Sequence, residues 1–188
     1  MTELHLVRHG ETEWSANGRH TSSTDLDLTD NGVAEATLLR GRLDPKAYQL
    51  VLSSPLLRAR RTAELAGFGA PEIDPDLHEW RYGDYEGLTT PQIREHDPGW
   101  TVWTHTSPGG ETADEVSRRL TRVIARIRES GVERALCFAH GHALRALTLT
   151  WLGLDLTLGD RFPLQTGTVS VLGDYKDGQA LISWNARP

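Results

Sequence analysis

The sequence has little that would support a secreted, membrane-bound or metal-thiolate protein. Its 188 residues include one cysteine, Cys137, so neither an internal disulfide nor a zinc site built from thiolates can form. No apolar run approaches the roughly 20 residues that a membrane-spanning helix requires. The start of the chain lacks the basic segment and long apolar stretch of a secretory signal. We therefore expect a cytoplasmic protein without a membrane partner.

Positive charge is also scarce, and most of it is arginine. The net charge is −6, and Lys46 and Lys176 are the only lysines among 20 basic residues. A negative chain is a poor ligand for nucleic acid or an anionic membrane surface, so neither is expected as a partner. Arginine still matters locally, because its guanidinium presents a rigid fork of donors to a phosphate.

Apolar periodicity predicts an alternation of strands and helices. Strands are expected over 4–7, 50–53, 135–139, 168–173 and 180–184, and helices over 30–43, 55–66, 90–98, 112–130 and 141–152. Asp177-Gly178 is a strong hairpin signal between the last two strands. This order predicts the α/β class: a three-layer α/β/α sandwich whose sheet is mostly parallel with one antiparallel strand. We expect a single domain over 1–188, with a small lid insertion around 80–110.

Three polar segments directly follow predicted strands. They are Arg8-His9-Gly10, Ser53-Ser54-Pro55 and His140-Gly141-His142, and Arg58 follows the second of them within a helix. In parallel sheets, ligands bind beyond the carboxyl ends of the strands, where these segments would meet. Two arginines and two histidines at one edge could neutralise a phosphoryl group, and imidazole is a competent nucleophile toward phosphorus. The residues thus indicate phosphoryl transfer without a metal.

A metal site is the main alternative reading of the same residues. His140 and His142 form a His-x-His pair, and Asp25 and Asp27 could add oxygen ligands. Because the nearby arginines would repel a cation, we expect no metal and no cofactor.

The ordered motifs resemble the histidine phosphatase superfamily, which is also called phosphoglycerate-mutase-like. Within it they are closest in appearance to the actinobacterial acid phosphatases once labelled phosphoglycerate mutases. The resemblance extends over essentially the whole chain, and it rests on residues 6–12, Trp14, 17–19, 27–32, 53–59, Thr62-Ala63, 77–87, 110–112 and 139–141.

The resemblance implies a role for each catalytic residue. His9 would attack phosphorus and carry a phosphohistidine, while Arg8, Arg58 and His140 would clamp the phosphoryl oxygens. Glu79 would protonate the leaving oxygen and then deprotonate the attacking water. The expected substrate-binding residues are Arg8, Ser15, Thr21, Ser22, Arg58, Tyr82, His140 and Gly141. Ser15 and Ser22 depart from the family pattern, in which asparagine and glycine are usual.

The segment 88–110 favours a hydrolase over a mutase. Mutases of this family carry a longer insertion there, whose basic residues hold the substrate carboxylate. Here Arg94 is the only arginine or lysine, and Trp100 and Trp103 are prominent. A shorter lid exposes the phosphohistidine to water. We therefore predict a phosphomonoesterase of the acid-phosphatase type acting on small phosphorylated metabolites. A cofactor-dependent phosphoglycerate mutase and a non-catalytic phospholigand-binding protein are the alternatives. The exposed sheet edge and the resemblance also suggest a homodimer.

Overall fold

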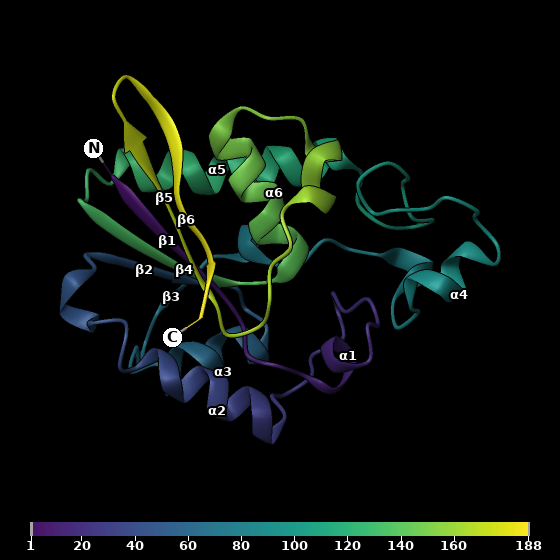
Figure 1. The fold of residues 1–188 in the computed structure, drawn as a ribbon, viewed down its shortest axis with the longest axis horizontal. Helices are drawn as coiled ribbons and strands as arrows, with labels where there is room; N and C mark the ends of the chain where they lie inside the picture. The colour runs from purple at the N-terminus through teal and green to yellow at the C-terminus, as the bar shows by residue number, and fades with distance from the viewer. Residues whose placement is uncertain (1, 188) are drawn as a thin grey trace.

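Six strands form one mixed sheet in the computed structural model, which describes residues 2–187 (Figure 1). The order is β3-β2-β4-β1-β5-β6. The β1, β2, β3 and β4 strands pair in parallel, and β5 pairs antiparallel with both β1 and β6. The predicted mostly parallel sheet with one antiparallel strand is confirmed. The strands span Glu3–Arg8 (β1), Leu50–Ser53 (β2), Glu72–Ile73 (β3), Arg134–Ala139 (β4), Val169–Tyr175 (β5) and Gly178–Ala186 (β6).

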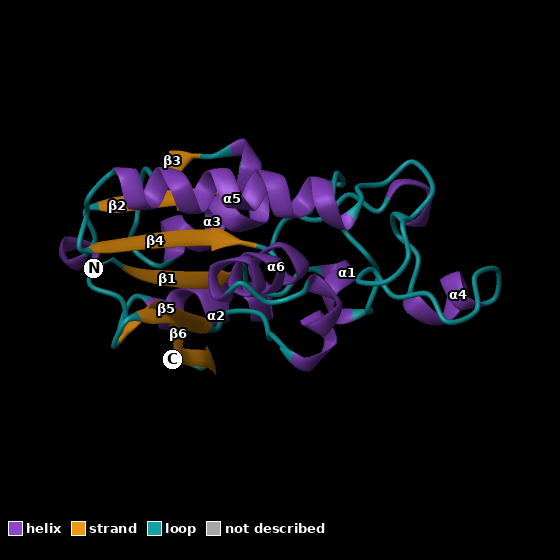
Figure 2. Cartoon of the chain, turned by 90° about the horizontal axis from the view of Figure 1, so that it is seen from above, coloured by secondary structure: helices purple, strands orange, loops and turns teal. Residues whose placement is uncertain are grey.

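Helices cover both faces of this sheet, which gives the predicted three layers (Figures 1 and 2). The α2 (Asp30–Leu39) and α3 (Leu57–Leu65) helices lie on one face, and α5 (Ala113–Glu129) and α6 (Gly141–Leu152) lie on the other. The larger core lies between the sheet and the α5/α6 pair. Shorter helical segments lie at Glu13–Ala16 (α1), Thr90–Arg94 (α4), Pro45–Ala47, Pro75–Leu77, Gly83–Tyr85 and Leu156–Arg161.

The α5 helix shows how local sequence specifies an element. Thr112 and Glu115 form a capping box at its start, which satisfies two free N–H groups. Apolar residues at helical spacing, including Val116, Leu120 and Ile127, are fully buried against the sheet. Each such burial contributes about 1.5–3 kcal/mol. Gly131, with a φ of 67°, follows the C-terminal end and continues the chain in the left-handed region.

One strand was not predicted, and several boundaries differ from the prediction; the helix expected over 90–98, for example, ends at Arg94 and continues as turns. The β3 strand consists of two exposed residues, too short for any periodicity to reveal it. The predicted helix over 30–43 stops at Leu39 and continues as turns. The α3 helix starts at Leu57 rather than Pro55, because Ser54 N–H still bonds to Phe138 across the sheet. A carboxylate oxygen of Asp25 then accepts the Leu57 N–H at 2.7 Å.

The segment 80–110 projects from the carboxyl end of the sheet and carries α4 (Figure 1). Trp80, Trp100 and Trp103 are buried within it or against the body. Its two ends are joined by paired hydrogen bonds, with Glu111 N–H donating to the Arg81 carbonyl and Arg81 N–H donating to the Glu111 carboxylate, both at 2.9 Å. Among residues 2–187, no helix has both the length and the apolar character needed to cross a membrane.

Candidate active site

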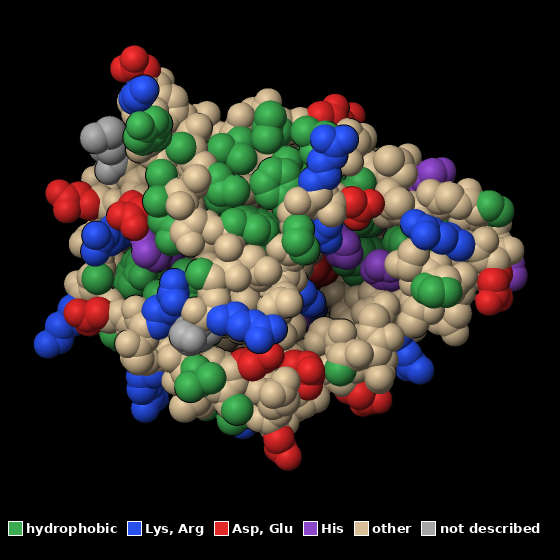
Figure 3. Space-filling model, in the orientation of Figure 1, with side chains coloured by type: hydrophobic (Ala, Val, Ile, Leu, Met, Phe, Trp, Pro, Cys, Tyr) green, Lys and Arg blue, Asp and Glu red, His purple; other side chains and the backbone are tan. Residues whose placement is uncertain are grey.

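A cavity of about 160 Å³ opens beyond the carboxyl end of β1. Figure 3 shows histidine side chains beside the hollow between the body and the lobe that carries α4. The lining residues come from the loop after β1, α1 and the segment before α2, from residues 79–82, from α6 and from the segment before β5. They are Arg8, His9, Thr12, Ser15, Gly18, Arg19, His20, Thr21, Glu79, Tyr82, Gly141, His142, Arg145 and Leu164.

His9 is buried in this cavity with one ring nitrogen fixed. Its Nδ1 lies 2.7 Å from the Gly10 carbonyl oxygen, which can only accept, so Nδ1 carries the hydrogen. Nε2 therefore holds the lone pair. Burial, followed by the cations Arg58 and Arg8, lowers the pKa of His9 well below its usual value. The imidazole is thus neutral near pH 7 and is suited to nucleophilic attack.

The loop that carries His9 is held by a close backbone approach. Gly10 and Gly32 pack so tightly that a Cβ on Gly10 would lie 2.3 Å from the Gly32 carbonyl oxygen. Thr62 on α3 accepts a hydrogen bond from Gly10 N–H at 3.0 Å. Glycine at both positions is therefore a steric requirement of the loop.

Arg8 presents an incompletely satisfied guanidinium to the cavity. Its Nη1 donates to the Leu164 carbonyl, whereas its buried Nε has no acceptor among residues 2–187. Gly141, the first residue of α6, allows this approach, because a Cβ there would lie 3.3 Å from the guanidinium. A buried donor without an acceptor is costly, and an anionic ligand would satisfy it.

Arg58 and His140 form a hydrogen-bonded pair next to His9. Arg58 Nε donates to His140 Nδ1 at 3.1 Å, and the His140 Nε2 lies 2.7 Å from the Ser54 hydroxyl. The His140 and His9 ring centroids are 5.2 Å apart. Burial, then Arg58, then His9 lower the pKa of His140 well below its usual value. Both rings are therefore neutral.

Glu79 is anchored at the start of α6. One carboxylate oxygen accepts the N–H groups of Trp80 and Ala143, each at 2.8 Å, and the other accepts the His142 N–H at 3.0 Å. The carboxylate thus caps a helix whose own N-cap side chain makes no capping bond. Glu79 is buried and held in the same cavity as His9.

The structure brings most of the predicted site residues together, but not all of them. Arg8, His9, Ser15, Thr21, Glu79, Tyr82 and Gly141 line the cavity. Arg58, His140 and Ser22 lie outside its lining. Arg58 donates to the carbonyls of Thr21, Ser22 and Thr24 as well as to His140, and the Ser22 hydroxyl donates to Glu86 at 2.5 Å. The Ser15 hydroxyl is occupied by its own capping box with Thr12.

Sequence reasoning missed several lining residues, notably His20 and Arg145. Arg145 had a detectable signal, because it follows Gly141 by four residues on the same helix and so shares its face. His20 had none, since it lies in an irregular loop whose path the sequence does not reveal. Within residues 2–187, no three His, Cys, Asp or Glu side chains gather as a metal site.

Comparisons with known proteins agree with this geometry. The model of the histidine phosphatase superfamily (branch 1) matches residues 4–187. An acid phosphatase of Mycobacterium tuberculosis is 45% identical over 90% of this chain and 85% of its own length. A probable phosphoglycerate mutase of Salmonella choleraesuis is 32% identical over 97% and 89%. A solved Mycobacterium tuberculosis structure covers 99% of this chain and 98% of its own, with a TM-score of 0.94 and 39% identity.

The fold and the comparisons define an α/β enzyme, and its candidate site contains a buried imidazole. The chain belongs to the histidine phosphatase superfamily. Family membership and the acid phosphatase relative together support an enzyme of the phosphatase class.

Proposed function

We propose that this protein hydrolyses small phosphate monoesters through a phosphohistidine on His9, without a metal. One observation carries the proposal: the fixed His9 imidazole shares a cavity with the guanidinium of Arg8, whose Nη2 makes no hydrogen bond within residues 2–187 and, unlike its Nε, is not enclosed by protein atoms. A phosphoryl oxygen would accept an N–H of that Nη2 and would bring phosphorus to the imidazole. Small phosphorylated metabolites fit the modest cavity volume of about 160 Å³.

The first step forms a bond between His9 Nε2 and phosphorus and breaks the ester P–O bond. Arg8 and the Gly141 N–H, which Glu79 leaves free at the start of α6, stabilise the charge on the phosphoryl oxygens. Glu79, in its protonated form, gives its proton to the departing alkoxide. His140 lies outside the lining, so its Nε2–H must leave the Ser54 hydroxyl before it donates to a phosphoryl oxygen. Arg58 acts by fixing the tautomer of His140.

The second step regenerates the enzyme. Water attacks the phosphohistidine, and the Glu79 carboxylate accepts a water proton as the P–N bond breaks. Inorganic phosphate leaves, and both His9 and Glu79 return to their starting protonation states. A single carboxyl group serves as acid and then as base, because Glu79 gives up a proton in the first step and takes one back from water in the second.

The lid supports hydrolysis over a mutase reaction. Arg94, the only arginine or lysine between 88 and 110, donates through Nε to the Trp100 carbonyl at 2.9 Å and does not line the cavity. Arg81, the other arginine of the segment 80–110, also lies outside the lining, so the lid supplies no cation to hold the carboxylate of a phosphoglycerate intermediate during reorientation.

The test is phosphate release from p-nitrophenyl phosphate, 3-phosphoglycerate and several sugar phosphates, with EDTA present. Wild-type protein is expected to release phosphate, and His9→Ala to release about a thousandfold less. Equal release by both proteins would overturn the proposal. Interconversion of 2- and 3-phosphoglycerate that depends on the bisphosphate, without net phosphate release, would instead establish a mutase.

A further inference from the structure

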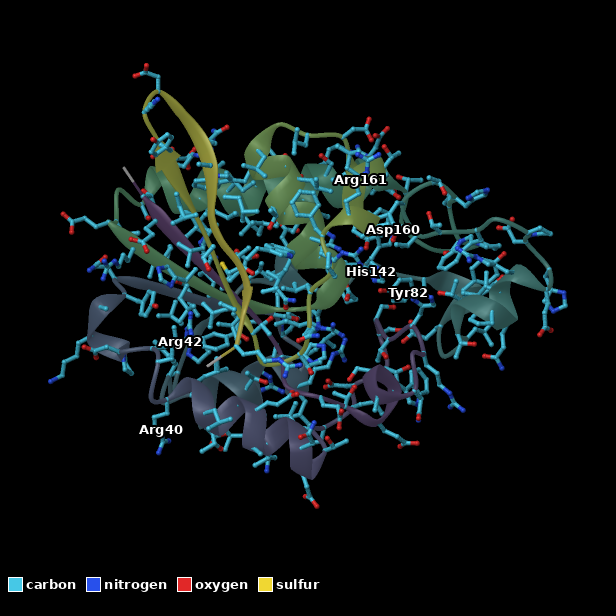
Figure 4. All side chains as sticks on the ribbon, in the orientation of Figure 1. Arg40, Arg42, Tyr82, His142, Asp160 and Arg161 are labelled. Atoms are coloured by element: carbon cyan, nitrogen blue, oxygen red, sulfur yellow. The ribbon has the colours of Figure 1, made fainter. Side chains whose placement is uncertain are left out.

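One half of the cavity has no part in the proposed phosphoryl chemistry. Arg8, His9 and Glu79 account for the reacting half, whereas His20, Tyr82, His142 and Arg145 line the remainder. Figure 4 shows His142 and Tyr82 side by side, with Asp160 close by and Arg161 farther out. The cavity contains three arginines, Arg8, Arg19 and Arg145, but Glu79 is its only carboxylate. With Glu79 protonated, as the proposed first step requires, three guanidinium charges face the charge of about −2 that one phosphate monoester carries, which leaves positive charge in excess.

Arg145 is held rigidly, yet one of its terminal nitrogens is free. Its Nε donates to the Gly159 carbonyl at 3.0 Å, Nη2 donates to the same oxygen, and the guanidinium lies over the Trp103 ring at 4.7 Å. Nη1 has no acceptor within residues 2–187, and it is not buried by other protein atoms. It therefore remains accessible to a ligand. A donor held in this way loses little conformational entropy when it binds an anion.

The carboxylate nearest to Arg145 neutralises it only weakly. Asp160 lies 3.5 Å from Nη2, but its side chain is 65% exposed and also accepts from the Trp103 ring N–H at 2.9 Å. The Arg145 side chain is 14% exposed. Exposed ion pairs are heavily screened by water, whereas the half-buried guanidinium keeps most of its field.

His142 adds a neutral donor beside this cation. Burial raises the pKa of Tyr82 well above its usual value, so its hydroxyl keeps the hydrogen that it donates to His142 Nδ1 at 2.6 Å. Burial and the Arg145 charge lower the pKa of His142, so its ring is neutral. Nδ1 is then the acceptor, and Nε2 carries a hydrogen without a partner within residues 2–187.

We propose that Arg145, assisted by His142, binds a second anionic group on the substrate. The enzyme would thus prefer phosphate monoesters that also carry a carboxylate or a second phosphate over uncharged alkyl phosphates. This assignment deepens the phosphatase activity proposed above and rests on it. Arg145 would take the place of the lid cations that this chain lacks.

The test is the ratio of kcat/KM between matched substrates. 3-Phosphoglycerate and glycerol 3-phosphate differ only in a carboxylate against a hydroxymethyl group. Propane-1,3-diol bisphosphate and propane-1,3-diol monophosphate differ only in a second phosphate against a hydroxyl group. We expect wild type to favour the more anionic member of at least one pair by about tenfold or more, as charge-assisted hydrogen bonds do. The favoured pair identifies the anion.

Variants separate binding from a structural role. Arg145→Gln is expected to reduce the ratio to within about twofold of unity, and Arg145→Lys to an intermediate value. Arg161→Gln removes the same charge from an exposed position outside the cavity lining, and it should keep the wild-type ratio. Loss of packing would lower both rates of a pair together and leave their ratio unchanged. A wild type without preference, or a ratio retained by Arg145→Gln, would overturn the proposal.

An inhibitor pair keeps the test decisive if Arg145→Gln does not fold. Wild type should be inhibited at least about tenfold more strongly by 3-phosphonopropionate than by propylphosphonate, which lacks only the carboxylate function. Equal inhibition would count against a carboxylate site, and it would overturn the proposal if the bisphosphate pair also showed no preference. Hydrolysis of glycerol 3-phosphate that is lost in His9→Ala tests the phosphatase activity itself and does not depend on Arg145.

Discussion

Arg58 Nε donates a hydrogen bond to His140 Nδ1 at 3.1 Å. Because a guanidinium can only donate, this bond fixes His140 as the neutral tautomer with its hydrogen on Nε2. The same arginine donates to the carbonyls of Thr21, Ser22 and Thr24. One buried side chain thus sets the protonation of the His140 imidazole and holds the loop that forms one wall of the cavity.

Loss of Arg58 should therefore affect both stability and the state of His140. Arg58→Ala is expected to lower the free energy of unfolding by about 3 kcal/mol, because four acceptors lose their donor. Arg60→Ala, on an exposed position of the same helix, should change it by less than about 0.5 kcal/mol. Urea unfolding measures both values. Nitrogen NMR should show the hydrogen on Nε2 of His140 in wild type, and hydrogen on Nδ1 instead would refute the tautomer assignment.

Because the Gly10 loop packs closely on Gly32, we expect Gly32→Ala to lower the free energy of unfolding, although helix propensity alone would raise it. Gly32 lies in the first turn of α2, where alanine would ordinarily be favourable by about 1 kcal/mol. A Cβ there would lie 2.1 Å from the Glu11 carbonyl oxygen, so Gly32→Ala should instead destabilise by about 1–3 kcal/mol and lower activity. Gly69→Ala, which meets nothing within 4 Å, is the matched control. Stabilisation by Gly32→Ala would contradict this packing.

Buried neutral histidines should make the protein less stable in acid. Burial lowers the pKa of His20 from 6.5 to about 4. Below about pH 6.5 the unfolded chain binds a proton that the folded protein does not bind until about pH 4. His20 alone should therefore reduce the free energy of unfolding by about 1.4 kcal/mol per pH unit across that window.

Urea unfolding between pH 7 and pH 5 checks this contribution. His20→Gln should show a shallower loss of stability toward acid than wild type, whereas His105→Gln, at an exposed position, should follow wild type. Parallel curves for wild type and His20→Gln would show that His20 does not titrate in this way.

The identity of the proton donor should appear in the dependence on the leaving group. Alkyl phosphates need a proton on the departing oxygen, while p-nitrophenolate leaves without one. Glu79→Gln should therefore slow alkyl phosphate hydrolysis by about a hundredfold or more, and p-nitrophenyl phosphate hydrolysis far less. Loss of the Glu79 hydrogen bonds to α6 alone would slow both substrates equally, and that result would remove Glu79 from the acid role.

Much of the fold and the reacting half of the site could be predicted from the sequence. Strong patterns, such as the apolar stripe and capping box of α5, specified their elements almost to the residue. The β3 strand could not be predicted, because Glu72 and Ile73 are exposed and pair only through their backbones. His9 and Glu79 stand in recognisable motifs. How deeply a side chain lies depends on tertiary packing, which the sequence does not reveal. For this reason the sequence could not predict that Arg58 and His140 lie behind the cavity lining, or that Arg145 lies within it.

The most direct test of the account is to trap the phosphorylated enzyme. Rapid acid-free quenching with a radiolabelled phosphate ester, followed by mass spectrometry of the peptides, locates the phosphoryl group. The account predicts a base-stable, acid-labile phosphohistidine on His9 that forms within a single turnover in the presence of EDTA and is absent from His9→Ala. Label on another residue, or turnover by His9→Ala at the wild-type rate, would contradict it.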